Sequence, residues 1–442
     1  MPLLFRSALA PVLFAVTLSG AGASVLHDYV SQDSGGYAYT IHSVETIPGG
    51  VAYHIELTSQ VWRDMPWTHW LTIIMPAEIR NWDTAMLFIA GGDQRATPPG
   101  LGSREAMAAA AMARQTGTPA AFVYQIPNQP LLGGLREDAL ISFTFEQYLE
   151  GRGDDWPLLL PMTKGAVRAM DAVQDFLNEE HGWAPDGFVI AGASKRGWTA
   201  WLAAVVDERV QGVVPMVFDV LNVDEQLDHQ LEAYGEISEM IRDYTQRDIH
   251  QRLDEPRARE LLALVDPYAY REALTAPKLI ILGANDPYWA VDAASLYFAD
   301  LPGPKHLRYE PNTGHDLGPG AVPAILAFYR AVLEGRTLPS YAWDTDGAGN
   351  ITVTWQGGSP RLRLWTAHSD TRDFRRSAWT SRPLMAEPGR CEAQVAPPAE
   401  GWKAYYVELV FQSGGGAPFG VTTTVQLLSS EASADDREEG AD

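Results

Sequence analysis

Cysteine is almost absent from this sequence: Cys391 is the only one among 442 residues. A single cysteine cannot form an intrachain disulfide, and no cysteine cluster is available to bind zinc or an iron–sulfur centre. Stability must therefore come from a hydrophobic core, for which the 46% hydrophobic residues supply ample material. We expect no metal and no cofactor, and we interpret Cys391 as a structural residue.

Basic residues are also scarce, with 33 Lys and Arg against 56 Asp and Glu and a net charge of −23. A chain this acidic is repelled by nucleic-acid phosphates and by anionic lipid. No basic patch with interleaved aromatic residues offsets this charge. Nucleic acid is therefore not an expected partner.

Long apolar runs are missing after the N-terminus, so no transmembrane helix is expected there. The N-terminus itself combines Arg6, an apolar segment at residues 8–18 and the small residues 21–23. These features predict a cleaved signal peptide over residues 1–23, with an uncleaved membrane anchor as the alternative. We expect the mature chain to begin near Ser24, to be exported (periplasmic or secreted), and to have no stable membrane insertion after cleavage.

The main body of the chain, residues 24–338, changes its pattern once. Residues 37–75 alternate polar and apolar positions and are rich in aromatic and β-branched residues, which predicts antiparallel strands. From residue 84 on, short continuous apolar runs alternate with helical patterns. This alternation predicts a mainly parallel sheet that has helices on both faces.

Three further segments depart from this α/β pattern. Residues 221–270 are charged, helical in spacing and without a strand, which predicts a helical cap over the C-terminal edge of the sheet, or a plain helical decoration. Residues 339–428 contain short alternating strands and predict a small C-terminal β-sandwich. Residues 429–442 are polar and acidic and predict a disordered tail.

The most informative segment surrounds Ser194. A buried-strand pattern at residues 187–192 ends just before this serine, and a helical pattern begins just after it. Strand, sharp turn and helix form the context of a nucleophile elbow, although the second glycine falls at Gly197 and Arg196 stands where glycine is expected. On its own, this pattern also suits a serine that caps a helix. The interpretation therefore depends on the catalytic partners.

A nucleophilic serine needs a histidine base, and the base needs an acid that orients it. In the α/β-hydrolase fold the three follow the chain order serine, acid, histidine. Asp286 and His315 lie in loops directly after two successive strand patterns, which places them at the same sheet edge as Ser194. We therefore predict an α/β-hydrolase with the triad Ser194, Asp286 and His315. Asp219, after the preceding strand, is the second candidate for the acid.

The oxyanion hole follows from the same geometry. One donor is expected to be the backbone N–H of Lys195, directly after the nucleophile. A second is expected from the loop after residues 84–90, where Gly91 and Gly92 precede Asp93. We assign this second donor to Gly92 or Asp93. The alternative for the glycine pair is a plain tight turn.

Several longer motifs resemble one family. The run GASKRGWTAWLAAVVDERVQGVVPMVFDVLN, the segment QIPNQPLL and the GANDPYW and NTGHDL loops are similar to the PhoPQ-activated pathogenicity-related protein family. The resemblance implies an α/β-hydrolase fold, export in bacteria, and similarity to esterase-like and dipeptidyl-peptidase-like hydrolases. The family also includes secreted eukaryotic regulators of proliferation. Glucuronoyl esterases have a similar G-x-S-[RK]-x-G pattern, which implies that the Lys195 side chain also helps the oxyanion.

Together these features predict hydrolysis of an ester or amide through an acyl-enzyme on Ser194. A carboxylesterase that acts on a small-molecule ester is the first interpretation. A dipeptidyl-peptidase-like serine peptidase is the second, because a cap could restrict access to chain ends. The third is a secreted binding or signalling protein that retains the fold.

Overall fold

The computed structural model describes residues 19–412 and 416–430. Most of the predicted signal peptide (residues 1–18) and most of the predicted tail (residues 431–442) lie outside these ranges. The structure corrects the start of that tail, because Ser429 ends strand β17 and pairs with Trp402 of strand β15. The polar character of residue 429 therefore marks the end of a strand.

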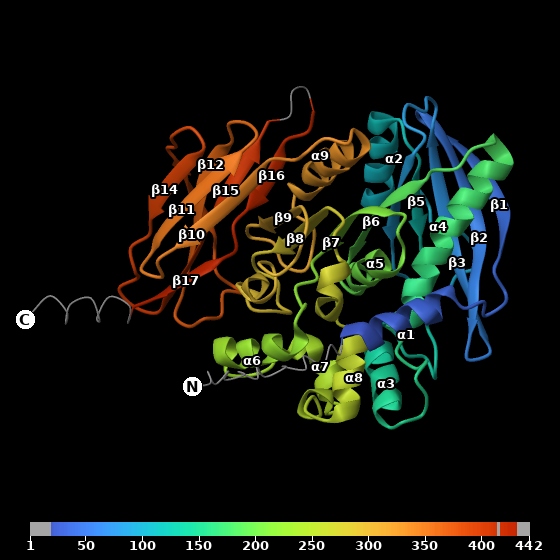
Figure 1. The fold of residues 1–442 in the computed structure, drawn as a ribbon, viewed down its shortest axis with the longest axis horizontal. Helices are drawn as coiled ribbons and strands as arrows, with labels where there is room; N and C mark the ends of the chain where they lie inside the picture. The colour runs from blue at the N-terminus through green and yellow to red at the C-terminus, as the bar shows by residue number, and fades with distance from the viewer. Residues whose placement is uncertain (1–18, 413–415, 431–442) are drawn as a thin grey trace, which may run out of the picture.

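The largest sheet of the described residues has nine strands, and it runs from the middle of the molecule to the right-hand edge in Figure 1. Its order is β1-β2-β3-β5-β4-β6-β7-β8-β9. The first three strands and the β3–β5 pair are antiparallel, and every pair from β5 to β9 is parallel. In chain order the strands are β1 (Ala38–Ile47), β2 (Gly50–Trp62), β3 (Met65–Pro76), β4 (Thr84–Ile89), β5 (Ala120–Val123), β6 (Gly187–Ala193), β7 (Val210–Met216), β8 (Lys278–Gly283) and β9 (Lys305–Glu310).

Helices cover both faces of this sheet, which explains the continuous apolar runs of its central strands. In β6, Phe188 and Ile190 face one hydrophobic cluster, and Val189 and Ala191 face the other. The first cluster includes residues of helices α4 and α5, and the second includes residues of α2 and α9. These four helices are α2 (Arg104–Thr116), α4 (Leu159–His181), α5 (Lys195–Val206) and α9 (Ala321–Leu333).

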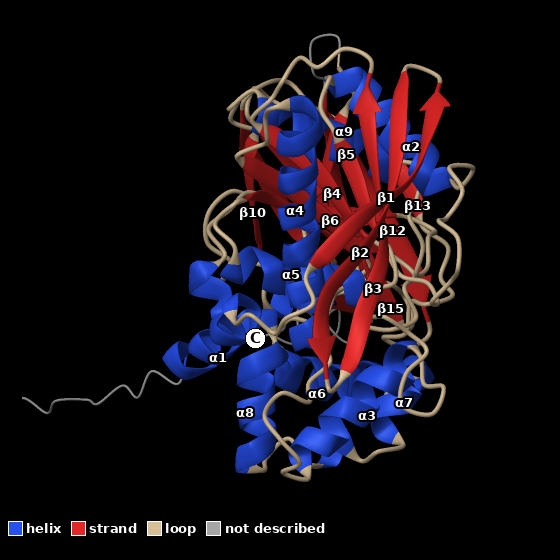
Figure 2. Ribbon diagram, turned by 90° about the vertical axis from the view of Figure 1, so that its right-hand side faces the viewer, coloured by secondary structure: helices blue, strands red, loops and turns tan. Residues whose placement is uncertain are grey.

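The segment between β7 and β8 contains helices and, within the described residues, no strand. Figure 2 shows α6, α7 and α8 gathered with α3 at one end of the sheet. We call this group the cap. Its helices are α3 (Glu137–Leu149), α6 (Val223–Tyr234), α7 (Arg242–Thr245) and α8 (Pro256–Val265), with short 3-10 turns η1 (Glu239–Ile241), η2 (Ile249–Gln251) and η3 (Pro267–Ala273).

The C-terminal part forms two further antiparallel sheets beside β9 (Figure 1). One has the order β10-β11-β14, and the other has the order β13-β12-β15-β16 with β17 also on β15. The β9 backbone is held there by the Tyr309 N–H, which donates to Thr422 Oγ1 at 3.2 Å. The strands are β10 (Ser340–Thr345), β11 (Asn350–Gln356), β12 (Arg361–Ser369), β13 (Thr380–Leu384), β14 (Arg390–Gln394), β15 (Trp402–Phe411), β16 (Phe419–Thr422) and β17 (Gln426–Ser429).

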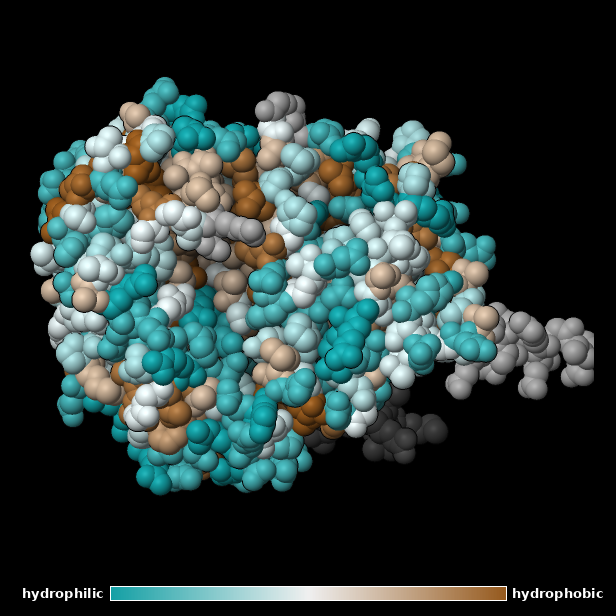
Figure 3. Space-filling view, turned by 180° about the vertical axis from the view of Figure 1, so that it is seen from behind, coloured by the Kyte–Doolittle hydropathy of each residue, from teal (hydrophilic) through white to brown (hydrophobic). Residues whose placement is uncertain are grey.

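The face of the molecule in Figure 3 is mainly polar. On this face, hydrophobic residues lie in small groups among hydrophilic ones. In residues 19–412 and 416–430, no helix is both long enough and apolar enough to cross a bilayer. The remaining described helix, α1 (Ser19–Ser31), buries Leu26 and Val30 in the main core. Both of these residues follow the predicted cleavage point.

Candidate active site

Ser194 occupies a strained turn between β6 and α5. Its backbone has φ 57° and ψ −127°, a conformation that costs a non-glycine residue about 1–3 kcal/mol. Two hydrogen bonds hold it: the Ser194 N–H donates to the Met216 carbonyl at 2.8 Å, and its own carbonyl accepts from the Trp198 N–H at 3.1 Å. The sequence therefore forms the sharp elbow that the strand-turn-helix pattern predicts.

The displaced glycine has a steric explanation. A Cβ on Gly192 would lie 2.2 Å from the Arg196 carbonyl oxygen, so only glycine fits there. A Cβ on Gly197 would lie 3.1 Å from the Gly192 carbonyl oxygen, which is tight but less restrictive. The Arg196 side chain points away from this contact, toward Glu137. The tight turn at Ser194 therefore requires glycine at position 192, whereas position 196 accepts a long side chain.

The three predicted triad residues meet in one continuous hydrogen-bonded chain. His315 Nε2 lies 2.9 Å from Ser194 Oγ, and His315 Nδ1 lies 2.7 Å from Asp286 Oδ2. An ionised carboxylate has no proton to give, so Nδ1–H is the donor to Asp286. In that tautomer Nε2 carries a lone pair and accepts the Ser194 hydroxyl proton. The His315 side chain is 24% exposed and that of Asp286 12% exposed, so a substrate can reach the base while the acid is mostly covered.

The structure does not bring Asp219, the alternative acid, to the histidine. Its carboxyl accepts a hydrogen bond from the Tyr297 hydroxyl at 2.7 Å and is buried. Burial raises the pKa of Asp219 to about 8; the Tyr297 bond opposes this rise, and the charges of Asp286 and Asp292 add to it. Of the two candidates, Asp286 is the one with the geometry of an orienting acid.

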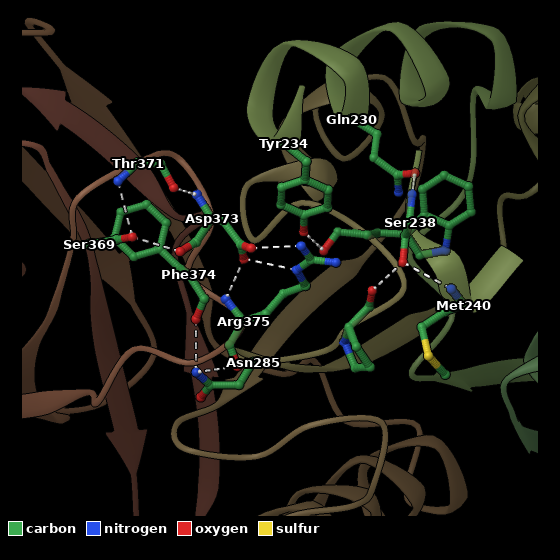
Figure 4. Close-up of polar contacts among 12 residues, drawn as sticks. Gln230, Tyr234, Ser238, Met240, Asn285, Ser369, Thr371, Asp373, Phe374 and Arg375 are labelled. Carbon is green, nitrogen blue, oxygen red and sulfur yellow. Dashed lines mark hydrogen bonds and ion pairs between the residues drawn. The ribbon is translucent and has the colours of Figure 1, made fainter. Parts of the chain in front are cut away.

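The loop that carries Asp286 is tied to the histidine loop, and through Asn285 it is also tied to the C-terminal part of the chain, as Figure 4 shows for the Asn285 side chain. The Asn285 N–H donates to the Thr313 carbonyl at 2.9 Å, which joins the two loops directly. The Asn285 side-chain amide donates to the Phe374 carbonyl at 3.0 Å and to the Ser377 carbonyl at 2.8 Å. We call residues 370–379, the segment between β12 and β13, the strap, because this segment contacts both loops.

The strap reaches the histidine loop through one tryptophan. The Trp379 N–H donates to Asn312 Oδ1 at 2.8 Å, and Asn312 Nδ2 donates to the Trp379 carbonyl at 3.0 Å. The Trp379 indole N–H also donates to the Ala284 carbonyl at 3.2 Å. The acid loop and the base loop are therefore fixed by the same C-terminal segment.

The cap holds the acid loop from its other side (Figure 4). Three cap side chains donate hydrogen bonds of 2.7–2.8 Å to consecutive carbonyls of residues 287–289. The donors are Gln230 to Tyr288, Tyr234 to Trp289 and Ser238 to Pro287. Arg375 of the strap lies over the Tyr234 ring, with its guanidinium carbon 4.1 Å from the ring centre. These contacts have no signal in the sequence, because the partners lie 49 or more residues apart.

The structure supports the first of the two predicted oxyanion donors more than the second. The Lys195 N–H belongs to the first residue of α5, where helix N–H groups have no acceptor within the helix. Gly91 borders the same cavity as Ser194. Asp93 turns its carboxylate to Arg136, at 2.9 Å from Nε, and Gly92 has φ 109°, a conformation that favours glycine. The role of Gly92 or Asp93 as the second donor stays a prediction.

The Lys195 side chain forms a buried ion pair beside the nucleophile. Its Nζ lies 2.7 Å from Asp138 Oδ2, and the Tyr244 hydroxyl donates to Asp138 Oδ1 at 3.0 Å. Burial lowers the pKa of Lys195, but the charge of Asp138 and the hydrogen bond to it raise that pKa by more, so the ammonium is retained. Its charge is therefore matched by a carboxylate that the sequence did not identify.

Arg196 forms a second pair with the neighbouring acid. Its guanidinium contacts both carboxylate oxygens of Glu137, at 2.6 and 2.7 Å, and its Nε donates to the Ile126 carbonyl at 2.6 Å. Burial raises the pKa of Glu137, but Arg196 lowers it by more, so the net pKa is below its usual value. This pair connects the elbow to the start of α3 and to the loop after β5.

Two cavities meet at Ser194 and His315. The smaller, of about 110 Å³, lies under the cap. The larger, of about 810 Å³, lies toward α2 and α9 and includes Gly91 in its wall. In the part of the chain that the structure describes, no group of three or more His, Cys, Asp or Glu side chains is arranged to hold a metal ion. Because the two cavities meet at Ser194, the two parts of a substrate that flank its reacting carbonyl can occupy one cavity each.

This chain is similar to several known proteins. The chain is 32% identical over 425 residues to autocrine proliferation repressor protein A of Dictyostelium discoideum, covering 87% of this chain and 85% of that protein. It superimposes on an acetyl xylan esterase from Paenibacillus sp. R4 with a TM-score of 0.52 at 15% identity, covering 73% of this chain and 94% of that one. Acetyl xylan esterase 1 from Thermoanaerobacterium sp. JW/SL YS485 reaches 0.49 at 14% identity, over 71% and 93%.

The predicted fold class is confirmed by the sheet order, the helices on both faces and the likeness to the Paenibacillus structure. The family model described as PhoPQ-activated pathogenicity-related protein matches residues 26–375. This match includes the elbow, both partner loops, the cap and most of the strap. The chain belongs to the PhoPQ-activated pathogenicity-related protein family.

Proposed function

We propose that this protein is an exported serine hydrolase that cleaves a carboxylic ester through an acyl-enzyme on Ser194. The observation that carries the proposal is the continuous chain from Ser194 Oγ through His315 to Asp286, with distances of 2.9 and 2.7 Å. Export is inferred from the signal-peptide pattern of residues 1–23. No cofactor takes part in the proposed reaction.

The proposed reaction has two halves. Ser194 Oγ attacks the ester carbonyl carbon while His315 Nε2 takes the hydroxyl proton, and Asp286 stabilises the resulting imidazolium. His315 then gives this proton to the leaving alcohol, and the acyl group stays on Ser194. A water molecule attacks the acyl-enzyme, with His315 again accepting a proton. The carboxylic acid leaves, and the proton returns to Ser194.

The tetrahedral intermediates carry a negative oxygen that needs donors. The Lys195 N–H at the start of α5 supplies one, and the Gly92 or Asp93 N–H supplies the second. A single donor of this kind contributes about 10²–10³-fold in rate. The positive end of the α5 helix dipole acts in the same direction.

The charges around Ser194 favour an ester over a dipeptide. A dipeptidyl-peptidase has to bind the free ammonium of a peptide N-terminus, and a buried ammonium needs an unpaired carboxylate. The two acids that open α3 near the nucleophile are Glu137 and Asp138. Both are already paired, with Arg196 and Lys195 respectively. In the cavity under the cap, where Asp138 is the only carboxylate among the described residues, a neutral acyl group therefore fits better than an amino terminus.

A signalling role is the second candidate. The Dictyostelium relative is named as an autocrine proliferation repressor, and its 32% identity extends over most of this chain. In that case the fold would serve as a secreted ligand, and the triad would have no role in the signal.

Labelling with a fluorophosphonate tests the proposal. The folded wild-type protein is expected to form one adduct, and peptide mass mapping is expected to place it on Ser194. Ser194→Ala is the control and should not react. Failure of the folded wild type to label would favour the signalling candidate, and an adduct on another residue would refute the assigned nucleophile.

A further inference from the structure

We infer that the acyl group of the substrate is a short, unbranched or singly branched alkanoyl group of about four carbons, held in the smaller cavity under the cap. This inference rests on the proposed function, because it assigns the acyl side of the same reaction. We call this cavity the acyl chamber. Ser194 and His315 border it, so a group inside it is attached to the carbonyl that Ser194 attacks.

Apolar side chains from separate elements form the walls of the acyl chamber. Phe145 comes from α3, Trp198 from α5, Ile249 from η2 and Leu261 from α8, while Phe218 follows β7. All five are buried. Trp198 and Phe218 stack with their ring centres 5.3 Å apart, which makes a flat wall directly behind the elbow. An alkyl chain is the chemical group that such a surface stabilises by burial.

The Lys195 ammonium and the Asp138 carboxylate, which both line the acyl chamber, already pair with each other. Asp138 is the only carboxylate in the chamber wall within the described residues, and Lys195 occupies it at 2.7 Å. The second carboxylate oxygen of Asp138 is taken by the Tyr244 hydroxyl at 3.0 Å. A sugar or a charged acyl group placed here would give up hydrogen bonds to water that this largely apolar wall could not replace in full, which is unfavourable. The chamber therefore selects an apolar group.

The volume limits the length of this group. The acyl chamber encloses about 110 Å³, whereas an apolar cavity of about 150 Å³ binds benzene, which has six carbons. In proportion, the chamber has room for about four carbons. The larger cavity, of about 810 Å³, lies on the other side of Ser194 and receives the alcohol. Selectivity is therefore expected on the acyl side, with wide tolerance on the alcohol side.

A series of p-nitrophenyl esters tests the inference in the full-length protein. The acyl chains are acetate, butyrate, hexanoate and octanoate, with the leaving group constant. Each buried methylene is expected to raise kcat/KM about fourfold, so butyrate should exceed acetate by roughly 15-fold. Hexanoate and octanoate should fall below butyrate, because their chains exceed the chamber.

Two matched variants on α8 separate the chamber from a general effect on the cap. Leu261 and Leu264 are both buried, at 2% and 4% exposure, but only Leu261 lines the chamber. Leu261→Ala should move the optimum from butyrate to hexanoate, since it removes three carbons from the wall. Leu264→Ala should lower the melting temperature to a similar extent and keep the butyrate optimum.

Each outcome has a defined meaning. A butyrate optimum that moves only in Leu261→Ala supports the acyl chamber. A rate that is flat or still rises at octanoate, or an equal shift in both variants, overturns it. Fluorophosphonate labelling of Ser194 without turnover of any ester in the series overturns the chamber and leaves the proposed function standing. A folded wild type that neither labels nor turns over an ester overturns both.

Discussion

Replacing Asp286 by Asn gives the sharpest test of the candidate triad. His315 Nδ1 lies 2.7 Å from Asp286 Oδ2, and the carboxylate is only 12% exposed. An asparagine is uncharged, and its amide N–H₂ can face Nδ1, which favours the tautomer that has its proton on Nε2. Nε2 could then no longer accept the Ser194 proton. We expect kcat to fall about 10⁴-fold, as for the equivalent change in a serine protease, with the fold retained.

This loss corresponds to about 5.4 kcal/mol of transition-state stabilisation. The matched control is Asp219→Asn, which changes a second buried acid near the same site. Its side-chain oxygen can still accept the Tyr297 hydroxyl, now 2.7 Å from Asp219 Oδ1, so kcat should change by less than about tenfold. Hydrolysis of p-nitrophenyl butyrate measures kcat, and circular dichroism with a thermal melt verifies that both variants are folded. A folded but inactive Asp219→Asn, beside an Asp286→Asn that keeps most of its activity, would refute the assignment.

Two further predictions follow from the surroundings of the triad. Burial raises the pKa of Asp219 to about 8 in the folded protein, well above the usual value for an aspartate. Between about pH 4 and pH 8, the folded state therefore keeps a proton that the unfolded state loses. The Asp219 carboxyl therefore lowers the free energy of unfolding as pH rises, by up to about 1.4 kcal/mol per pH unit. Urea unfolding at pH 5 and pH 8 should show this slope in the wild type and not in Asp219→Asn. An equal change of the unfolding free energy with pH in the two proteins would contradict the raised pKa. Asn285→Leu should lower kcat at least about tenfold with a small change in KM, because the acid loop would lose its bonds to Phe374 and Ser377 of the strap. The control is Asn350→Leu, which removes a bond to Asp346 in a distant hairpin and should leave kcat unchanged. Equal effects of the two changes on kcat would show that the strap has no role in positioning the acid loop.

The elements of the fold were predictable where a short stretch of sequence carries the whole signal. The runs that became β4, β6 and β8 are continuous in apolar residues because both of their faces are covered by helices. Residues 421–428 alternate like one strand in the sequence but belong to two strands, β16 and β17, and the segment between them. Residues 423–425 separate them, and there the Thr423 hydroxyl accepts the Val407 N–H in place of a strand carbonyl. A side-chain hydrogen bond of this kind does not change the hydrophobic pattern, so the break between the two strands could not be predicted from that pattern.

The position of the candidate triad was predictable for a topological reason. Ser194, Asp286 and His315 each follow a strand of one parallel sheet, and the carboxyl ends of parallel strands share an edge. Chain order alone could not exclude Asp219, because it follows β7 and lies at the same edge. The choice between the two acids came from the direction of the side chains, with Asp286 facing His315 and Asp219 facing Tyr297.

By itself, the sequence thus determined the parallel sheet, the elbow and the three residues at its edge, because each depends on local spacing or on strand order. Only the tertiary structure decided what surrounds them. The Lys195–Asp138 pair, the contact between Asn285 and the strap, and the volume of the acyl chamber all join segments that lie far apart in the chain. Such contacts have no periodicity along the sequence, since they arise when separate helices and loops are packed together around one core.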